Sequence, residues 1–246
     1  MKSDPFRPPE RIALFERPAP LPTWLQLMLD SAPSLLWAGL TFTIPLTLLS
    51  FIFGLILGLI TAVARLFGPA PVVVIARFYV WVIRGTPLLV QLFVIFYGLP
   101  SANILLDAFT AALIGFSLNV GAYTSEIIRA VISSVPRGQW EAAYSIGMSW
   151  SQAMRRTILP QATRVAVPPL SNTFISLVKD TSLAAAITVP EMFQTAQRIV
   201  ATTYEPLILY ILAALIYLAM SSVLSALQVR LERRFARYGG FLEARA

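Results

Sequence analysis

The residues in this chain whose types and spacing suit chemistry lie on one segment of a largely apolar sequence. Thr173, Leu177 and Asp180 are spaced i, i+4 and i+7, so a helix would place them on one face, flanked by Asn172 and Ser176. A carboxylate beside hydroxyl and amide groups can receive the ammonium group of a small solute. The same polar stripe could equally serve as a contact between two helices of a bundle.

Four further charged residues interrupt apolar stretches. Arg84, next to the break Gly85-Thr86-Pro87, could hold a carboxylate or simply fix that break. Asp180 could contact substrate or pair with Arg84 or with Lys179 of a neighbouring helix, because adjacent residues of one helix point in different directions. Glu126 and Arg129, spaced i, i+3, are expected to form an ordinary surface pair. Structural ion pairing and direct substrate contact both remain open for Asp180.

Whole classes of active site are excluded by composition. The chain has no Cys and no His, so thiolate metal sites, disulfides and imidazole-dependent catalysis are excluded. None of its 12 Gly residues lies in a phosphate-binding GxxxxGK[ST] loop. We therefore expect no catalytic residues, no metal ligands and no cofactor in this chain, and any ATP chemistry must come from a partner.

The elements that position these residues are predicted to be membrane-spanning helices. Of 246 residues, 57% are hydrophobic and only 13% are charged, whereas a soluble domain has about 25% charged residues. Mean hydropathy is +0.72. The fold class expected is an all-α, polytopic membrane helix bundle. The net charge of +7 is then a signal of membrane topology rather than of nucleic-acid binding.

Five spans account for the apolar runs. The fourth has only 14 uncharged residues, 165–178, so it must continue through Lys179 and Asp180 and bring both into or near the membrane. Gly54 and Gly58 form a GxxxG pair in the first span; such pairs are frequent in apolar helices, and we expect a chance occurrence. The predicted spans are 38–64, 75–99, 107–132, 165–190 and 206–229.

Charge asymmetry sets the expected orientation. With the N-terminus outside and the C-terminus cytoplasmic, twelve Lys and Arg residues lie in inner segments and five in outer ones, which agrees with the positive-inside rule. Residues 1–33, with seven prolines, are predicted to be an irregular tail with one short interfacial helix near 24–29. Residues 34–232 form the transmembrane domain, and 233–246 a basic cytoplasmic tail.

The loop at 133–164 is too patterned for a plain connector. Residues 139–146 are strong helix formers that stop at Gly147, and Ser149 with Gln152 makes a capping box for a second helix. The loop is therefore predicted to be two short helices at an angle.

The charges of this loop are compatible with two different roles. The first helix carries the acid Glu141, and the second carries Arg155 and Arg156 and is expected to end at Pro160. Such a hairpin can lie on the inner membrane surface or dock a soluble partner. A DNA-reading helix-turn-helix is also conceivable, but the five spans that tether the loop argue against it.

The sequence EAAYSIGMSWSQAMRRTILP, residues 141–160, resembles the EAA loop of ABC importer permeases. Thr157 departs from that pattern, since an aliphatic residue is usual there, and one packing contact is expected to be weaker. The stretches RGTPLLVQLFVIFYGLP, GAYTSEIIRA and FISLVKDTSLAA resemble the polar amino-acid branch of the family, and the resemblance covers residues 35–235. The residues that match the EAA pattern are Glu141, Ala142, Ala143, Gly147, Leu159 and Pro160.

The resemblance implies a permease subunit of the bacterial inner membrane that performs no covalent chemistry. It implies that 139–146 is a coupling helix in a cleft of a cytoplasmic ATPase, with Ala142 and Ala143 allowing close packing and Glu141 offering a charge-assisted contact. The implied partners are two ATPase subunits that bind ATP and Mg, a second permease copy or a paralogue, and an extracytoplasmic amino-acid-binding protein.

The substrate implied is a polar amino acid, with L-cystine as the candidate, because QWEAAYSIGM and PPLSNTFISLVKDTSLAA are most similar to that subgroup. Thr173 is neutral, so a cationic side chain would find no partner beyond Asp180. The rival readings are a self-sufficient channel or secondary transporter, and a membrane scaffold. The residues expected along the substrate path are Arg84, Asn172, Thr173, Ser176 and Asp180.

Overall fold

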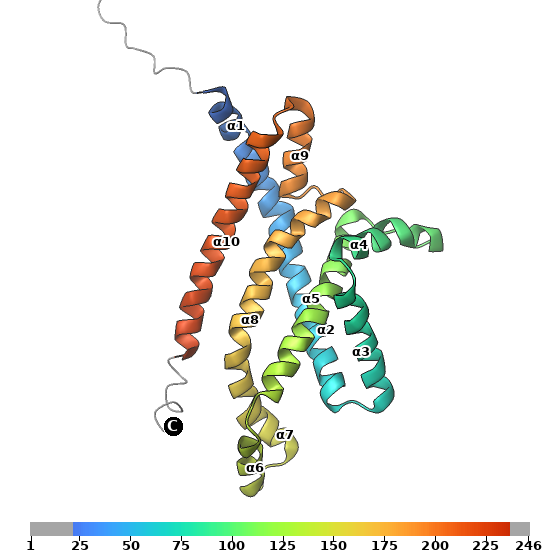
Figure 1. Cartoon of the computed structure of the whole chain (residues 1–246), viewed down its shortest axis with the longest axis vertical. Coiled ribbons are helices and arrows are strands. Elements are labelled where there is room, and N and C mark those ends of the chain that lie inside the picture. The colour runs from blue at the N-terminus through green and yellow to red at the C-terminus, as the bar shows by residue number, and fades with distance from the viewer. Residues whose placement is uncertain (1–21, 237–246) are drawn as a thin grey trace, which may run out of the picture.

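The computed structural model describes residues 22–236, and within that range all regular structure is helical (Figure 1). The uncharged run 31–64 lies within one long rod of 45 residues, from Thr23 to Phe67. It consists of α1 (Thr23–Ala38), the wide turn η1 (Gly39–Thr43) and α2 (Ile44–Phe67). The prediction of an all-α bundle is confirmed for the described residues.

The rod begins earlier than the sequence predicted. Residues 24–29 were expected to form a separate interfacial helix within an irregular tail reaching residue 33, but α1 runs through them and through Pro33. The reason is packing: Leu35 is fully buried among Met192, Ala196 and Leu212 of two later helices, and Met28 packs against the same cluster. The predicted tail at 1–21 and the end of the basic tail at 237–246 lie outside the described residues.

The centre of the bundle is the pair α2 and α5 (Ala108–Ser133). The two helices approach closely at glycines of α2, where a Cβ on Gly54 would lie 2.5 Å from Val120 and a Cβ on Gly58 would collide with Thr124. The GxxxG pair is therefore a real helix contact and not a chance occurrence, because only residues without a Cβ allow this separation.

The second predicted span is sharply broken. α3 (Ala70–Gly85) and the chain that follows it, Leu88–Ala102, meet at 106°. Thr86 is extended and Pro87 has no N–H, so the helix cannot continue. Gln91 Nε2 caps the break by donating to the carbonyls of Ile83 and Thr86 at 2.7 and 3.1 Å. The elements after the break are α4 (Leu88–Phe93), η2 (Val94–Gly98) and η3 (Leu99–Ala102).

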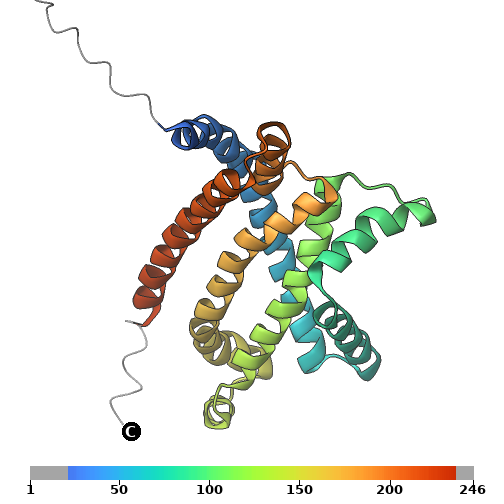
Figure 2. The same cartoon turned by 45° about the horizontal axis from the view of Figure 1, so that its top comes forward.

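The loop predicted to be two short helices lies at one end of the bundle, opposite α1 and α9 (Figures 1 and 2). It contains α6 (Arg137–Ser145), α7 (Trp150–Ala153) and the wide turn η4 (Met154–Ile158). The prediction that Pro160 ends the second helix is wrong, since η4 leads directly into α8 (Leu159–Asp180). A π-type turn just before Pro160 leaves room for a ring that would clash in a regular helix.

The chain returns through η5 (Thr181–Ile187) and α9 (Met192–Thr203) to α10 (Pro206–Ala236). In both views α8 runs beside α5 along the bundle, and α10 diverges from it toward the C-terminus (Figure 2). By length and composition three helical segments can cross a membrane, Thr23–Phe67, Ala108–Ser133 and Pro206–Arg233, and the broken pair raises the total to four. α8 is less apolar and is not in that set.

Candidate functional site

A polar cavity of about 500 Å³ lies between the break after α3, helix α5 and helix α8. It brings together four of the five residues predicted for a substrate path, and Leu177 lines it as well. Asp180 is the ionisable carboxylate of this cavity. The polar groups that line it are Thr86, Asn119, Tyr123, Asn172, Thr173, Ser176 and Asp180.

The local structure of α8 decides which of these groups are free for a ligand. Thr173 Oγ1 donates to the carbonyl of Pro169 at 2.9 Å, and Asn172 Oδ1 accepts from Gln228 of α10 at 2.9 Å. Across the described chain, no Lys or Arg pairs with the carboxylate of Asp180. Asp180 and Ser176 are therefore the polar groups of α8 that keep their full bonding capacity for a solute.

The opposite face of α8 is anchored on apolar packing. Phe174 meets Phe51 of α2 edge to face, with ring centroids 5.1 Å apart. On the cavity side of α8, Leu177 is buried in the main core with Leu46, Leu92 and Phe116. This packing fixes the rotation of α8, so the stripe predicted from the i, i+4, i+7 spacing faces the cavity.

Arg84 is not in this cavity. Its guanidinium carbon lies 5.2 Å from the centre of the Tyr123 ring, and its Nη1 lies 3.5 Å from a carboxylate oxygen of Glu126. The hypothesis that Arg84 pairs with Asp180 is thus replaced by a pair with Glu126. Tyr123 lines the polar cavity on one side and, with Arg84, a second pocket on the other.

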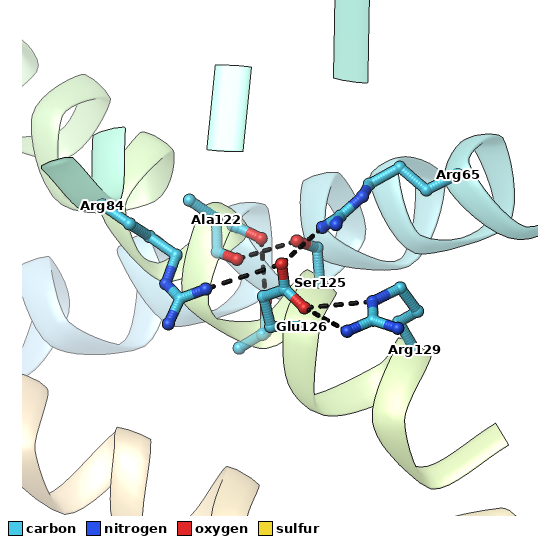
Figure 3. A network of polar contacts seen from close by, with 8 residues as sticks. Arg65, Arg84, Ala122, Ser125, Glu126 and Arg129 are labelled. Atoms are coloured by element: carbon cyan, nitrogen blue, oxygen red, sulfur yellow. Dashed lines mark hydrogen bonds and ion pairs between the residues drawn. The ribbon is translucent and has the colours of Figure 1, made fainter. Parts of the chain in front are cut away.

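Glu126 is the centre of an ionic cluster formed by three helices (Figure 3). Arg65 of α2 approaches Glu126 Oε1 at 2.7 Å, Arg129 of α5 donates to Oε2 at 2.9 and 3.0 Å, and Arg84 comes from α3. The glutamate side chain is only 21% exposed. The predicted pair with Arg129 is therefore present, but it belongs to a partly buried cluster and is not an ordinary surface pair.

Sequence reasoning missed the roles of Arg65 and Tyr123, and underestimated Glu126. A signal was present: Glu126 is the only acidic residue between Asp107 and Glu141, inside a segment predicted to span the membrane. An acid at that position needs positive partners, because an unpaired charge there is costly. Which arginines supply them depends on the helix rotation, which the sequence did not reveal.

The EAA-like loop has two different faces. Ala143 is 3% exposed, and Trp140 packs against a cluster at the ends of α5 and α8 that includes Val131 and Ile158. Glu141 and Ala142 of the same helix are exposed. The loop therefore rests on the helices that line the polar cavity and leaves the other face of α6 exposed.

Two predicted signals fix the angle within this loop. Gly147 adopts φ +81°, in the left-handed region that favours glycine. Ser149 and Gln152 form both hydrogen bonds of the capping box. The expected stop at Gly147 and the expected cap are both confirmed.

The remaining matching residues lie at the junction with α8. Leu159 and Pro160 are exposed, Leu159 by 37%. Thr157 is half-buried and its hydroxyl contacts the sulfur of Met148 at 3.8 Å, so the departure from an aliphatic residue exchanges one packing contact for a weak polar one. Gln161 Nε2 donates to Gln139 Oε1 at 2.9 Å and ties α8 to α6.

Comparison with known proteins bears on both sites. A family model described as "Binding-protein-dependent transport system inner membrane component" matches residues 54–237. The L-cystine transport system permease protein TcyB of Bacillus subtilis is 58% identical over 205 residues, 83% of this chain and 88% of that protein. The arginine transport system permease protein ArgU of Corynebacterium glutamicum is 41% identical, over 79% of this chain and 66% of that protein.

A solved structure shares the fold. It is described as an amino acid ABC transporter with histidines, and it superposes with a TM-score of 0.81 at 37% identity. The match covers 85% of this chain and 97% of that one.

Proposed function

We propose, from the premise that this chain belongs to the family of binding-protein-dependent transport system inner membrane components, that it moves a polar amino acid by alternating access driven by a partner ATPase. As a permease subunit of an ABC importer, it is a multi-pass protein of the inner membrane and not itself an enzyme. Its residues bind, gate and transmit movement.

The observation that carries the proposal is the position of α6 below the polar cavity. α6 packs against the cluster at the ends of α5 and α8 through Trp140, and its Gln139 accepts a hydrogen bond from Gln161 of α8 at 2.9 Å. The same two helices line the cavity. A movement imposed on α6 therefore reaches the cavity through two continuous helices. The differential contacts of the two ATPase states would supply the free energy.

The proposed membrane topology has five spans, with the N-terminus outside and the EAA-like loop in the cytoplasm. The rod Thr23–Phe67, the broken pair, α5, α8 and α10 are the five crossings. α8 is included although it is less apolar, because it runs beside α5 along the bundle (Figure 1). Its charged end then lies in the membrane, which is costly unless it serves a pathway.

The proposed ATPase contact is the exposed face of α6. Glu141 offers a charged acceptor, Ala142 a small surface, and Gly147 the turn that fixes the angle to α7. Leu159 and Pro160 mark the exposed start of α8 beside it. Two ATPase subunits would bind ATP and Mg, so we propose no cofactor in this chain.

For the substrate we propose a polar amino acid whose ammonium group meets Asp180, with L-cystine as the first candidate. The relative at 58% identity is a cystine permease and the one at 41% an arginine permease. Thr173 adds no second negative charge to the cavity, which favours a substrate without a cationic side chain.

The remaining proposed partners are an extracytoplasmic binding protein and a second permease, identical or paralogous. The polar cavity opens at the side of this single bundle, between α4, α5 and α8. A second permease would close it and provide the other wall of the pathway.

The test is uptake of labelled L-cystine by proteoliposomes that contain this chain with its ATPase and binding protein. We expect accumulation only when ATP is present on the ATPase side. Accumulation by the chain alone, driven by an ion gradient, would identify a secondary transporter and refute the proposal.

A further inference from the structure

An apolar groove runs along α10 on the side away from the polar cavity. Two adjoining cavities, of about 560 and 460 Å³, share Phe174 and Leu224 as lining residues. Together they form one channel between α10 and the α2–α8 pair. Its walls are mainly aliphatic and aromatic, with the small hydroxyl residues Thr47 and Ser171 among them. Gln228 and the charged Arg230 lie near one end.

The groove has the length of one lipid tail. It follows α10 from Ala219 to Leu231, a helical rise of about 18 Å. One leaflet of the hydrocarbon core is about 15 Å thick. A single acyl chain lying along α10 would thus fill the groove from the headgroup level to the bilayer centre.

The charge lies at the end where a headgroup would be. Arg230 follows directly after the uncharged run 206–229, so it lies at the membrane boundary. Among the described residues no carboxylate pairs with Arg230, and the neighbouring Glu232 accepts instead from Gln228 at 2.8 Å. Its guanidinium is available for a phosphate, which it can bind through two parallel hydrogen bonds.

α10 itself contributes little to the protein core. Only 17% of its most apolar 18-residue window is buried, and Leu227 in the groove is 51% exposed. The groove is therefore filled by hydrocarbon from the membrane unless another protein covers it.

We infer that this groove is a specific site for an anionic phospholipid of the leaflet on the coupling-loop side, with one acyl chain along α10 and the phosphate on Arg230. The acyl chain would fill the space between α10 and the α2–α8 pair, at the level of the polar cavity. Assignment of the leaflet rests on the proposed topology, whereas the site itself does not depend on transport.

The test is native mass spectrometry of the full chain titrated with phosphatidylglycerol or with phosphatidylcholine. We expect one phosphatidylglycerol to bind about fivefold more tightly than phosphatidylcholine, the preference that one arginine near a lipid surface confers. Arg230→Gln should abolish the preference. Arg233→Gln, one helical turn further along and outside the groove, should keep it.

A second variant separates the acyl chain from the headgroup. Leu224→Trp fills the groove at the residue that both cavities share, and it should abolish tight binding of both lipids while gel filtration shows an intact chain. Equal retention of phosphatidylglycerol by the wild-type chain and by Arg230→Gln would overturn the inference.

The same site can be tested for a protein occupant. The chain has no Cys, so a single Leu227→Cys variant reports contacts at the groove without background. We expect no disulfide-linked dimer in oxidised membranes. An efficient cross-link between two copies of this variant would show that the second permease covers the groove, and would overturn the lipid assignment without affecting the proposed transport function.

Discussion

Arg84 lies over the ring of Tyr123, with 5.2 Å between the guanidinium carbon and the ring centre. The ring separates two unlike pockets: the polar cavity with Asp180 and the basic pocket with Arg65, Arg77 and Glu126. Tyr123 is thus a partition between the carboxylate expected to meet a substrate ammonium group and a cluster rich in arginine. This relationship joins the substrate path to the ionic contact that fastens α3 to α5.

The partition gives the first prediction. Tyr123→Ala removes the stacking surface of Arg84 and opens the two pockets to each other, so uptake of L-cystine should fall severalfold. Tyr123→Phe keeps the ring and the cation–π contact, which is worth about 0.5–1 kcal/mol at a partly exposed site, and should retain most of the uptake. Equal uptake by the two variants would show that the ring has no such role.

The second prediction concerns Glu126, which holds arginines of three helices. Glu126→Gln leaves these arginines without their counter-charge in a partly buried site, and should destabilise the chain by about 3 kcal/mol. Thermal unfolding of the detergent-solubilised chain measures the loss. Glu141→Gln removes a charge from the exposed face of α6 and should leave Tm unchanged; if it lowers Tm as much, net charge rather than the cluster is responsible.

The third prediction concerns the contact between α2 and α5. Gly58→Ala puts a Cβ against Thr124, and overpacking of this kind costs about 1–3 kcal/mol. Gly39→Ala, whose Cβ would meet only Met192 at an ordinary 3.8 Å, should be neutral or stabilising. Chemical denaturation of both variants checks the difference, and a stable Gly58→Ala chain would refute the close approach.

The fourth prediction concerns the charge in the polar cavity. Asp180→Asn keeps the shape but loses the partner for an ammonium group, so we expect uptake to fall by about tenfold or more, the effect of losing a charge-assisted hydrogen bond of roughly 1.5–3 kcal/mol. Lys179→Gln, next in sequence but outside the cavity lining, should change uptake less than twofold. If both variants transport normally, Asp180 is a structural residue.

The sequence predicted features that depend on residues close together in the chain, but it did not predict contacts between residues far apart in the chain. Local signals were reliable: Gly147 and the Ser149–Gln152 box stop and start the helices where expected, and the polar spacing on α8 correctly placed four residues on one cavity. Contacts between distant parts of the chain could not be predicted in this way. The partners of Glu126 come from α2 and α3, and their meeting requires helix rotations that no spacing reveals.

Proline was the other source of error. Pro160 and Pro33 were expected to end or exclude helix, but a preceding wide turn accommodates the first and tertiary packing of Leu35 retains the second. At Pro87, by contrast, Gln91 satisfies the freed carbonyls and the break persists. Whether a proline breaks a membrane helix depends on its surroundings.

The central claim is that α6 transmits movement from an ATPase to the cavity, and Gly147 tests it most directly. Gly147 has φ +81° with open space around it, so Gly147→Val strains the turn without a clash, whereas Asn tolerates this conformation. The measurement is L-cystine transported per ATP hydrolysed in proteoliposomes. We predict that Gly147→Val lowers this ratio strongly and Gly147→Asn nearly preserves it; full transport with normal coupling in Gly147→Val would contradict the account.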